Sequence, residues 1–333
     1  MPIHHTKLTR AALSGAAIMA AAGLASSAFQ EAAAARDRRR FPPPGQLVDI
    51  GGRRLHLLEA GQGSPAVVVV GALADGVMSW PRVQRALAAE MRVVLYDRAG
   101  VGWSDPPHGH CTLDDMGAEL RDLLNAAQIT PPYVLVAHSL GGIIARRFAA
   151  RWPGSVAGMV LVDSSHEQQA SRKGVHGWRH GRSSYYQSVL KWQLRPLGLY
   201  RLGAAAGLAR ELTADVAEMA LPEHAAAVRA IMLSTRTRRA IVREMLWMAG
   251  LTDQPPGLGS IPLTVITATG QDQPGWREMQ DELAALSSAS RHVLAEGSSH
   301  YVHLDDPELV CQAVRELMAQ ICAGPAPAAA APG

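Results

Sequence analysis

A serine in the segment Val136-Ala-His-Ser-Leu-Gly-Gly142 has the surroundings of a catalytic nucleophile. The segment joins a strongly apolar stretch to a helical pattern, and a serine on such a turn presents its hydroxyl above the edge of a sheet. Small residues two positions to either side, Ala137 and Gly141, let strand and helix approach each other. A serine that only caps the following helix would also fit this position. The pattern predicts Ser139 as a nucleophile if a base and an acid accompany it.

A candidate base and two candidate acids follow this serine along the chain. His300 comes after a short apolar stretch and directly precedes the last helical pattern. Asp272 follows a β-branched run on what should be a loop, and Asp163 ends an earlier apolar run. A serine hydroxyl becomes nucleophilic when a histidine takes its proton, and an acid orients that histidine. We predict Ser139, His300 and Asp272 as a catalytic triad, with Asp163 as the alternative acid.

Two more histidines stand beside these candidates. His303 lies about one helical turn beyond His300 and is expected to pack or to face solvent. His138 adjoins Ser139, and we expect its side chain to point away from the nucleophile in a structural role. No metal-ligand spacing is present along the chain. Hydrolysis by a serine triad needs no metal and no cofactor, so we expect neither.

Short β-branched runs alternate with helical patterns over most of the chain. The expected strands are Gln46–Ile50, Arg54–Glu59, Ala66–Val70, Arg92–Tyr96, Tyr133–Ala137, Gly158–Val162, Leu263–Thr267 and Ser290–Ala295. The expected helices are Pro81–Glu90, Leu113–Ala127, Gly142–Trp152, Gln273–Ser287 and Asp306–Cys322. Uninterrupted apolar strands suit a parallel sheet covered on both faces, connected by right-handed crossovers. The pattern predicts an α/β fold with a mostly parallel, doubly wound sheet and a helical cap insertion.

Changes in composition divide the chain into six predicted parts. They are a signal peptide or N-terminal leader (1–35), a linker (36–45), the first part of the core (46–165), a helical cap (166–260), the second part of the core (261–322) and a disordered tail (323–333). The cap interrupts the alternation of strands and helices between two core strands. Because such an insertion emerges at the carboxyl ends of the strands, we expect it to roof the active site and to exclude bulky substrates.

The N-terminal leader has the marks of a secretory signal. Two basic residues precede the uncharged run Ala11–Phe29, which ends in the small residues Ser26–Ala28. Cleavage is expected after Ala28, with Ala34 or Ala35 as alternatives, and an uncleaved Ala-rich anchor is the other interpretation. Alanine is weakly hydrophobic, so we expect no stable membrane insertion once the leader is removed. This pattern predicts a secreted or periplasmic protein.

Four stretches of the chain resemble landmarks of the α/β-hydrolase superfamily. They are Tyr96–Asp105, Tyr133–Gly142, Val160–His166 and His300–Pro307. The resemblance runs from about Gln46 to Cys322 and implies the α/β-hydrolase fold, with Ser139, His300 and an acid as the triad. In that family the segment around Asp97 and Arg98 is structural, so neither is expected to be catalytic.

The oxyanion of the reaction needs two backbone N–H donors. One is expected from Leu140, at the start of the helix after the nucleophile. The other belongs to the loop Gly71–Gly76, where the family often carries a His-Gly motif that is absent here. By position, Leu73 is the first candidate for the second donor and Ala72 the next.

Composition limits the class of partner. The chain is 48% apolar and 18% charged with a formal net charge of +3, enough for a large core but with no charge run typical of nucleic-acid binding. We therefore expect a small-molecule, ester-like substrate and no nucleic acid. Cys311 and Cys322 should lie about 16 Å apart on one helix and cannot form a disulfide, whereas a pairing of Cys111 is left open.

The expected cap is rich in basic and aromatic residues, with 13 Lys and Arg against 7 Asp and Glu between His166 and Leu258. Its aromatic residues are Trp178, Tyr185, Tyr186, Trp192, Tyr200 and Trp247. They could line a pocket for a substrate with an apolar body and an anionic or polar group, or they could pack the cap onto the core.

The sequence as a whole predicts a serine hydrolase that cleaves small carboxylic esters, lactones or thioesters through an acyl-enzyme. The same triad could instead perform C–C cleavage, amide hydrolysis or cofactor-free perhydrolysis. A catalytically silent ligand-binding protein is the alternative of another class, against which the complete triad argues. Dehalogenases and epoxide hydrolases resemble this fold but place an aspartate at the nucleophile position, where this chain has Ser139.

Overall fold

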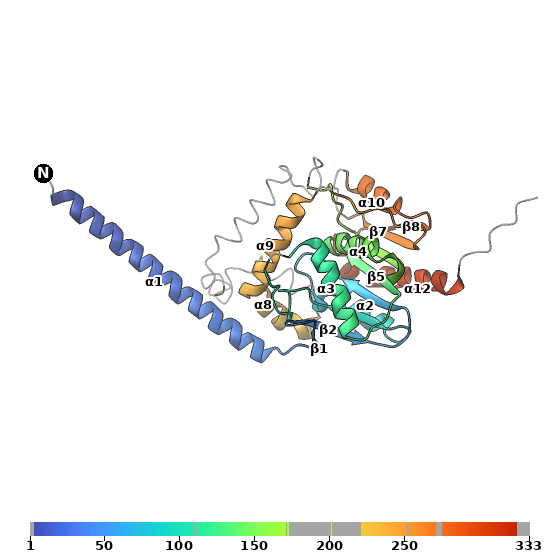
Figure 1. Ribbon diagram of the computed structural model, residues 1–333, viewed down its shortest axis with the longest axis horizontal. Helices are drawn as coiled ribbons and strands as arrows, with labels where there is room; N and C mark the ends of the chain where they lie inside the picture. Colours follow the sequence, from blue (N-terminus) through green and yellow to red (C-terminus); the bar gives the residue numbers. More distant parts are fainter. Residues whose placement is uncertain are drawn as a thin grey trace, which may run out of the picture. The chain divides into compact units, whose positions relative to one another are not determined.

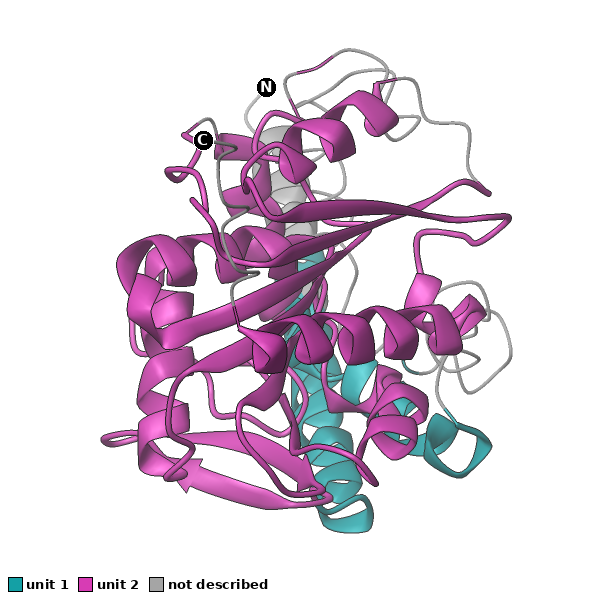
Figure 2. Ribbon diagram, turned by 90° about the vertical axis from the view of Figure 1, so that its right-hand side faces the viewer, with its two compact units in different colours: residues 1–42, 190–238 teal, residues 43–189, 239–333 magenta. Residues whose placement is uncertain are grey.

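A computed structural model of the chain describes residues 3–109, 111–170, 172, 201, 221–251, 253–270 and 275–324. The chain forms two compact units, which Figure 2 colours separately. The first contains residues 1–42 and 190–238, and the second contains residues 43–189 and 239–333. The candidate site lies in the second unit.

The second unit is built around an eight-stranded sheet (Figure 1). The strands are β1 (Gln46–Asp49), β2 (Arg54–Ala60), β3 (Ala66–Val70), β4 (Val93–Tyr96), β5 (Tyr133–His138), β6 (Val156–Val162), β7 (Leu263–Ala268) and β8 (Ser290–Ala295). Their order is β1-β2-β4-β3-β5-β6-β7-β8. The pairs from β4 to β8 are parallel, while β1 pairs with β2 and β2 with β4 in antiparallel fashion. This confirms the predicted α/β fold class.

The antiparallel β1–β2 hairpin closes through two glycines. Gly51 and Gly52 have φ angles of +98° and +90°, a backbone region that glycine enters without strain. The carboxylate of Asp49 accepts hydrogen bonds from both of their N–H groups. The turn chemistry therefore fixes the register in which Leu47 pairs with His56.

Helices cover the sheet of the second unit. They are α2 (Pro81–Leu87), α3 (Leu113–Ala126), α4 (Leu140–Arg151), α10 (Trp276–Ala284), α11 (Val302–Asp305) and α12 (Pro307–Ala323), with the 3₁₀ turns η1 (Val77–Ser79) and η2 (Pro153–Ser155). Figure 1 shows α3 and α4 side by side, and α2 and α12 also pack together. Val68 and Val70 of β3 belong to the same hydrophobic cluster as residues of α3 and α4. Since side chains alternate along a strand, Val67 and Val69 face away from that cluster, where they are also buried.

Helix α4 approaches the sheet very closely where it begins. A Cβ atom at Gly141 would lie 2.0 Å from the carbonyl oxygen of Val70 and 2.7 Å from that of Gly71. Both atoms belong to the backbone of β3 or its following loop, so no side-chain rotation could relieve the clash. The small residue predicted two positions after Ser139 is thus required by the contact between helix and strand.

The first unit contains the long helix α1 (Ile3–Arg40), η4 (Pro222–His224) and α8 (Ala225–Met232), and helix α9 (Thr235–Gly250) runs from this unit into the second. Helix α1 continues without interruption through the predicted leader–linker boundary after residue 35. By length and composition, Leu13–Arg40 could cross a membrane, with a mean hydropathy of 1.3. A signal sequence would pass the same test, so the apolar helix alone does not decide between them.

The C-terminal part of α1 makes specific contacts within its own unit. Gln30 is fully buried and its Nε2 donates to the carbonyl oxygen of Leu233 at 2.7 Å. Arg201 donates to Gln30 Oε1 at 3.1 Å and forms an ion pair with Asp37. Ala34 is 3% exposed. Gln30, Ala34 and Asp37 therefore make contacts within this unit, unlike the exposed Leu13, Ile18 and Leu24 nearer the N-terminus.

All three cysteines are free: Cys111 and Cys311 are buried, and Cys322 is exposed. Cys111, whose pairing the sequence leaves open, forms no disulfide. Burial raises the pKa of the Cys111 thiol to about 12, so this side chain stays a neutral thiol at neutral pH.

Much of the predicted cap lies outside the described residues. This holds for Trp178, Tyr185, Tyr186, Trp192 and Tyr200, and the last nine residues of the predicted tail are likewise not described. Trp247 on α9 is described, and it packs partly buried against the main hydrophobic cluster of the second unit. The cap boundaries and the roofing of the site remain predictions.

We predict that Gly141→Ala destabilises the protein by about 3 kcal/mol or prevents its folding, because the added methyl group would overlap backbone oxygens. Gly154→Ala is the matched control, since nothing lies within 4 Å of the position that its methyl group would take. Urea unfolding of both variants measures the difference. Equal stability of the two variants would contradict the close approach of α4 to β3.

Candidate active site

Ser139 occupies a strained turn between β5 and α4. Its backbone has φ 51° and ψ −121°, a region that residues other than glycine rarely enter. It stands at the N-cap of α4, but its side chain makes no capping hydrogen bond, so helix capping does not account for this serine. The hydroxyl instead lies 3.3 Å from the hydroxyl of Ser165. The turn thus costs conformational energy and leaves the hydroxyl available for chemistry.

His300 follows β8 and is held by a carboxylate through its Nδ1 atom. Nδ1 donates to Oδ2 of Asp163 at 2.6 Å, and the Asp163 side chain is 2% exposed. This bond places the imidazole proton on Nδ1 and leaves Nε2 as the basic nitrogen. The ring of Trp276 meets the His300 ring edge-on, with 6.3 Å between the ring centroids. Its position is therefore set by a buried acid and an aromatic neighbour.

Asp163 is itself fixed by donors from two further elements. Its Oδ1 accepts from the N–H of Ala268 at 3.0 Å, at the end of β7, and from Nε1 of Trp276 at 2.8 Å. The residue has φ 39°, a second strained backbone position at a strand end. Together with His300, these donors compensate the buried carboxylate and hold it in one orientation.

The predicted acid Asp272 lies outside the described residues, so its position relative to His300 stays untested. The alternative acid, Asp163, is the carboxylate that contacts His300. It follows β6, which lies directly beside β5 and its nucleophile in the sheet. The sequence signal for it was an aspartate directly after an apolar strand, the same signal that favoured Asp272.

The loop after β6 also brings Ser165 beside Ser139, which the sequence did not indicate. The Ser165 N–H donates to the carbonyl oxygen of Ser139 at 2.9 Å. This loop is held by the fully buried Arg146 of α4, which donates to the carbonyl oxygen of Ser165 at 3.0 Å and to Glu167 at 2.7 Å. Both members of the Arg146–Glu167 ion pair are buried, and the pair keeps the loop that carries Asp163 against α4.

The loop after β3 is expected to supply an oxyanion donor. Its backbone is held by the side chains of Arg98 and Glu244. Arg98 donates to the carbonyl oxygens of Gly71 and Ala72, and it pairs with Glu244 of α9, which is fully buried. Glu244 also accepts from the N–H of Ala74 at 2.9 Å. Removing either partner would leave an unpaired buried charge, at a cost of about 3–5 kcal/mol. Arg98 is therefore structural, as the family resemblance implied.

The same loop narrows the choice of oxyanion donor. The N–H of Ala72, the second candidate, donates to the side chain of Asp75 at 3.3 Å within the loop. Leu73 is partly buried and Leu140 is buried directly after the nucleophile. The pair Leu73 and Leu140 remains the proposal for the two donors.

Asp97 organises the neighbouring turn instead of taking part in chemistry. Its carboxylate accepts from the N–H groups of Val77 at 2.9 Å and Trp103 at 3.1 Å, and from Nδ1 of His56 at 2.7 Å. A Cβ at Gly102 would lie 2.1 Å from the same carboxylate, so the turn needs a glycine there. The side chain is 1% exposed.

His138 and His303 are both buried beside the candidate base. His138 Nε2 donates to the backbone carbonyl oxygen of His300 at 2.8 Å, which ties the nucleophile turn to the base. The ring of His303 stacks on Trp80, with 4.1 Å between centroids. His303 thus packs and does not face solvent. Burial lowers the pKa of His138 well below its usual value and that of His303 to about 3, so both rings are neutral at neutral pH.

Taken together, the residues support one kind of chemistry. A strained serine, a histidine with a basic nitrogen and a buried carboxylate all follow strands at one edge of the sheet. Such a set transfers a proton from the serine hydroxyl to the imidazole while the carboxylate stabilises the resulting charge.

Comparison with known proteins agrees with this geometry. A family model described as alpha/beta hydrolase fold matches residues 65–307. A protein from Gibberella zeae named AB hydrolase superfamily protein is 27% identical over 288 residues, which cover 76% of this chain and 85% of that protein.

Two solved structures share the architecture. A thermophilic esterase from Thermogutta terrifontis aligns with a TM-score of 0.63 and 22% identity, over 83% of this chain and 97% of its own. The enol-lactonase from Burkholderia xenovorans aligns with a TM-score of 0.64 and 22% identity, over 83% of this chain and 100% of its own. At these identities the likeness shows the fold.

We predict that Asp163→Asn slows labelling of Ser139 by a fluorophosphonate probe by about 10³-fold or more, because an amide would present N–H donors to His300 and favour the wrong tautomer. Asp272→Asn, the matched control, should change the labelling rate far less. Circular dichroism of both variants checks that the fold is kept. The opposite ranking would assign the acid role to Asp272.

Proposed function

Because this chain belongs to the α/β-hydrolase family, we propose that it is a serine hydrolase that cleaves small carboxylic esters through an acyl-enzyme. The observation that carries the proposal is the Asp163–His300 hydrogen bond of 2.6 Å beside a serine held in a strained turn. Backbone strain at a buried polar cluster is typical of functional sites.

The proposed reaction follows from the roles of the side chains. Ser139 attacks the ester carbonyl carbon while Nε2 of His300 takes the hydroxyl proton. Asp163 stabilises the imidazolium that forms, and the N–H groups of Leu140 and Leu73 receive the negative oxygen of the tetrahedral intermediate. The imidazolium then returns its proton to the departing alcohol, which leaves the acyl group on Ser139.

The second half of the reaction releases the acid. A water molecule gives a proton to His300 and adds to the acyl carbon of the Ser139 ester. Collapse of this second intermediate returns the proton to Ser139 and frees the carboxylic acid. Each step uses side chains of this chain and water alone.

Small esters and lactones are the substrates that the observations favour. The two solved structures compared above, an esterase and an enol-lactonase, have a similar fold. A cap inserted between β6 and β7 would emerge at the carboxyl ends of those strands, where the site lies, and would favour small substrates over polymer surfaces. Lactones and thioesters fit the same acyl-transfer chemistry.

The experiment that tests this proposal compares wild type with Ser139→Ala on a panel of esters. We expect hydrolysis of short and medium acyl esters, little activity on emulsified long-chain triglycerides, and a loss of at least about 10³-fold in Ser139→Ala. A fluorophosphonate probe should label wild type once, at Ser139. Ser165→Ala serves as the control, since it also removes a hydroxyl from the site but should still be labelled. Labelling that survives in Ser139→Ala would overturn the assignment.

We also propose that the N-terminal apolar helix acts as a secretory signal cleaved after Ala28. The small residues Ser26 and Ala28 suit the recognition of a cleavage site. Cleavage there would keep the buried Gln30 and Ala34, whereas cleavage after Ala34 or Ala35 would remove Gln30 and its bond to Leu233. The packing within the first unit thus favours the earlier position among the three.

Expression with the native N-terminus in a bacterial host tests this. We expect protein in the periplasm or the medium whose intact mass corresponds to a start at Phe29. Replacing Ala28 by a bulky residue in Ala28→Leu should abolish that product, and Ala22→Leu, within the apolar run, should not. Full-length protein in the cytoplasm would refute export, and full-length protein in the membrane fraction would indicate an uncleaved anchor.

A further inference from the structure

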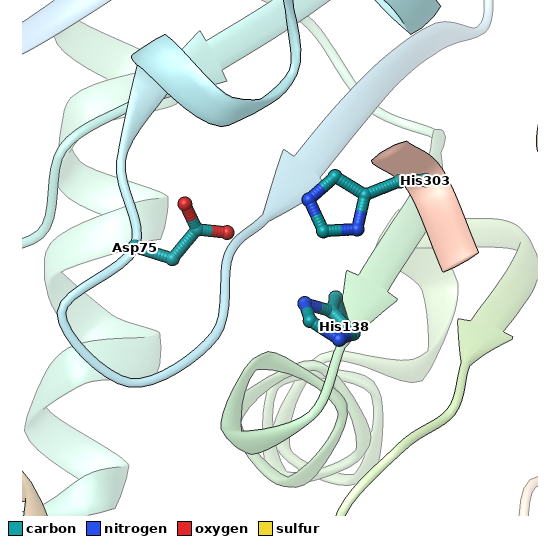
Figure 3. Close-up of side chains that lie close together, drawn as sticks. All are labelled: Asp75, His138 and His303. Carbon is teal, nitrogen blue, oxygen red and sulfur yellow. The ribbon is translucent and has the colours of Figure 1, made fainter. Parts of the chain in front are cut away.

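Three side chains from distant parts of the chain meet beside the candidate triad. They are Asp75 from the loop after β3, His138 from the end of β5 and His303 from α11. One potential ligand atom from each lies within 4.8 Å of the other two. Figure 3 shows the carboxylate of Asp75 and the two imidazole rings turned toward one another.

Three of the four imidazole nitrogens of this cluster lack hydrogen-bond partners among the described residues. Nδ1 of His138 and both ring nitrogens of His303 are buried and make no hydrogen bond among the described residues. The two side chains are 0% and 1% exposed. Buried polar atoms are nearly always paired, and leaving one unpaired costs free energy. Each neutral ring has one nitrogen with a free lone pair, so two such lone pairs next to a carboxylate indicate a ligand with positive charge.

Neighbouring groups hydrogen-bond to His138 and Asp75 and so fix the orientation of these side chains, as is common for metal ligands. His138 donates its Nε2–H to the carbonyl oxygen of His300, which leaves the Nδ1 lone pair free to coordinate. Trp80 donates its Nε1–H to Asp75 at 3.1 Å, and its ring stacks on His303. Oδ2 of Asp75 accepts from Trp80 and from the N–H of Ala72, whereas Oδ1 accepts only from Ser79 and still has a lone pair to offer.

We propose that Asp75, His138 and His303 form a binding site for a divalent transition-metal ion of the Zn²⁺ class. Two neutral imidazoles and one carboxylate suit Zn²⁺, whose bonds to such ligands are about 2.0–2.2 Å long. Ligand atoms in a tetrahedral site are then about 3.3 Å apart, so the three groups must close in by about 1.5 Å at most. A water molecule completes the coordination.

The site would have a structural role that complements the triad. Asp75 belongs to the loop expected to hold the oxyanion donor, His138 precedes the nucleophile, and His303 lies three residues after the base. One ion would thus join the three segments that carry the parts of the active site. Because the ion takes no part in acyl transfer, this inference does not rest on the proposed ester hydrolysis.

Metal content and unfolding temperature of the tag-free full chain test the proposal without an activity assay. We expect about one zinc ion per chain after dialysis, measured by elemental mass spectrometry. After removal by a chelator, Zn²⁺ at 100 times its dissociation constant should raise the unfolding midpoint by at least about 3 °C. Co²⁺ in place of Zn²⁺ should give the visible absorption of a tetrahedral site.

Variants locate the ion. His303→Phe keeps the stacking on Trp80 but removes both nitrogens, and Asp75→Asn keeps the hydrogen-bond acceptor but removes the charge. Each substitution should weaken zinc binding at least tenfold. If His303→Phe does not fold, Asp75→Asn still tests the site. His292→Phe, at a half-buried histidine bonded to Thr267 and Asp281, is the control and should bind like wild type. A wild type without zinc and without a thermal shift, or variants that bind like wild type, would overturn the proposal.

Discussion

The close contact between the start of α4 and the end of β3 is the constraint on which the site depends. Gly141 has no room for a side chain against the backbone of β3, so the chain must turn sharply between β5 and α4. That turn forces Ser139 into a left-handed backbone conformation and withdraws its hydroxyl from helix capping. Packing of a buried helix on a buried sheet thus stabilises a local conformation that the serine would avoid on its own.

The parallel sheet converts this local feature into a site. Strands β3, β5, β6 and β8 all end at one edge, so the loops that follow them converge although they are far apart in sequence. Two buried arginines keep these loops in place, Arg98 on the loop after β3 and Arg146 on the loop after β6. Each pairs with a buried glutamate, so the charges that position the site are compensated inside the protein.

Most of the fold could be predicted because strands and helices are local features of the sequence. The strand Ala66–Val70 and the turn from strand to helix at Ser139 agree with the prediction, because burial on both faces and a tight turn each favour particular residue types. The acid could not be decided in the same way. Asp163 and Asp272 both follow strands, and the contact of Asp163 with His300 depends on the order of β6, β7 and β8 in the sheet. Sequence spacing does not encode that order.

The cluster of Asp75, His138 and His303 also depends on contacts between segments that are far apart in the sequence. From the sequence, His138 is expected to be structural and His303 to pack or face solvent, and neither has a metal-ligand spacing. In the fold they are buried without hydrogen-bond partners for three of their nitrogens, and a carboxylate faces them. A hydrophobic pair at these positions would avoid that cost, so their polarity needs a cause that packing does not supply. A cation between them provides one, and it would bind where the three loops that form the active site come closest to each other.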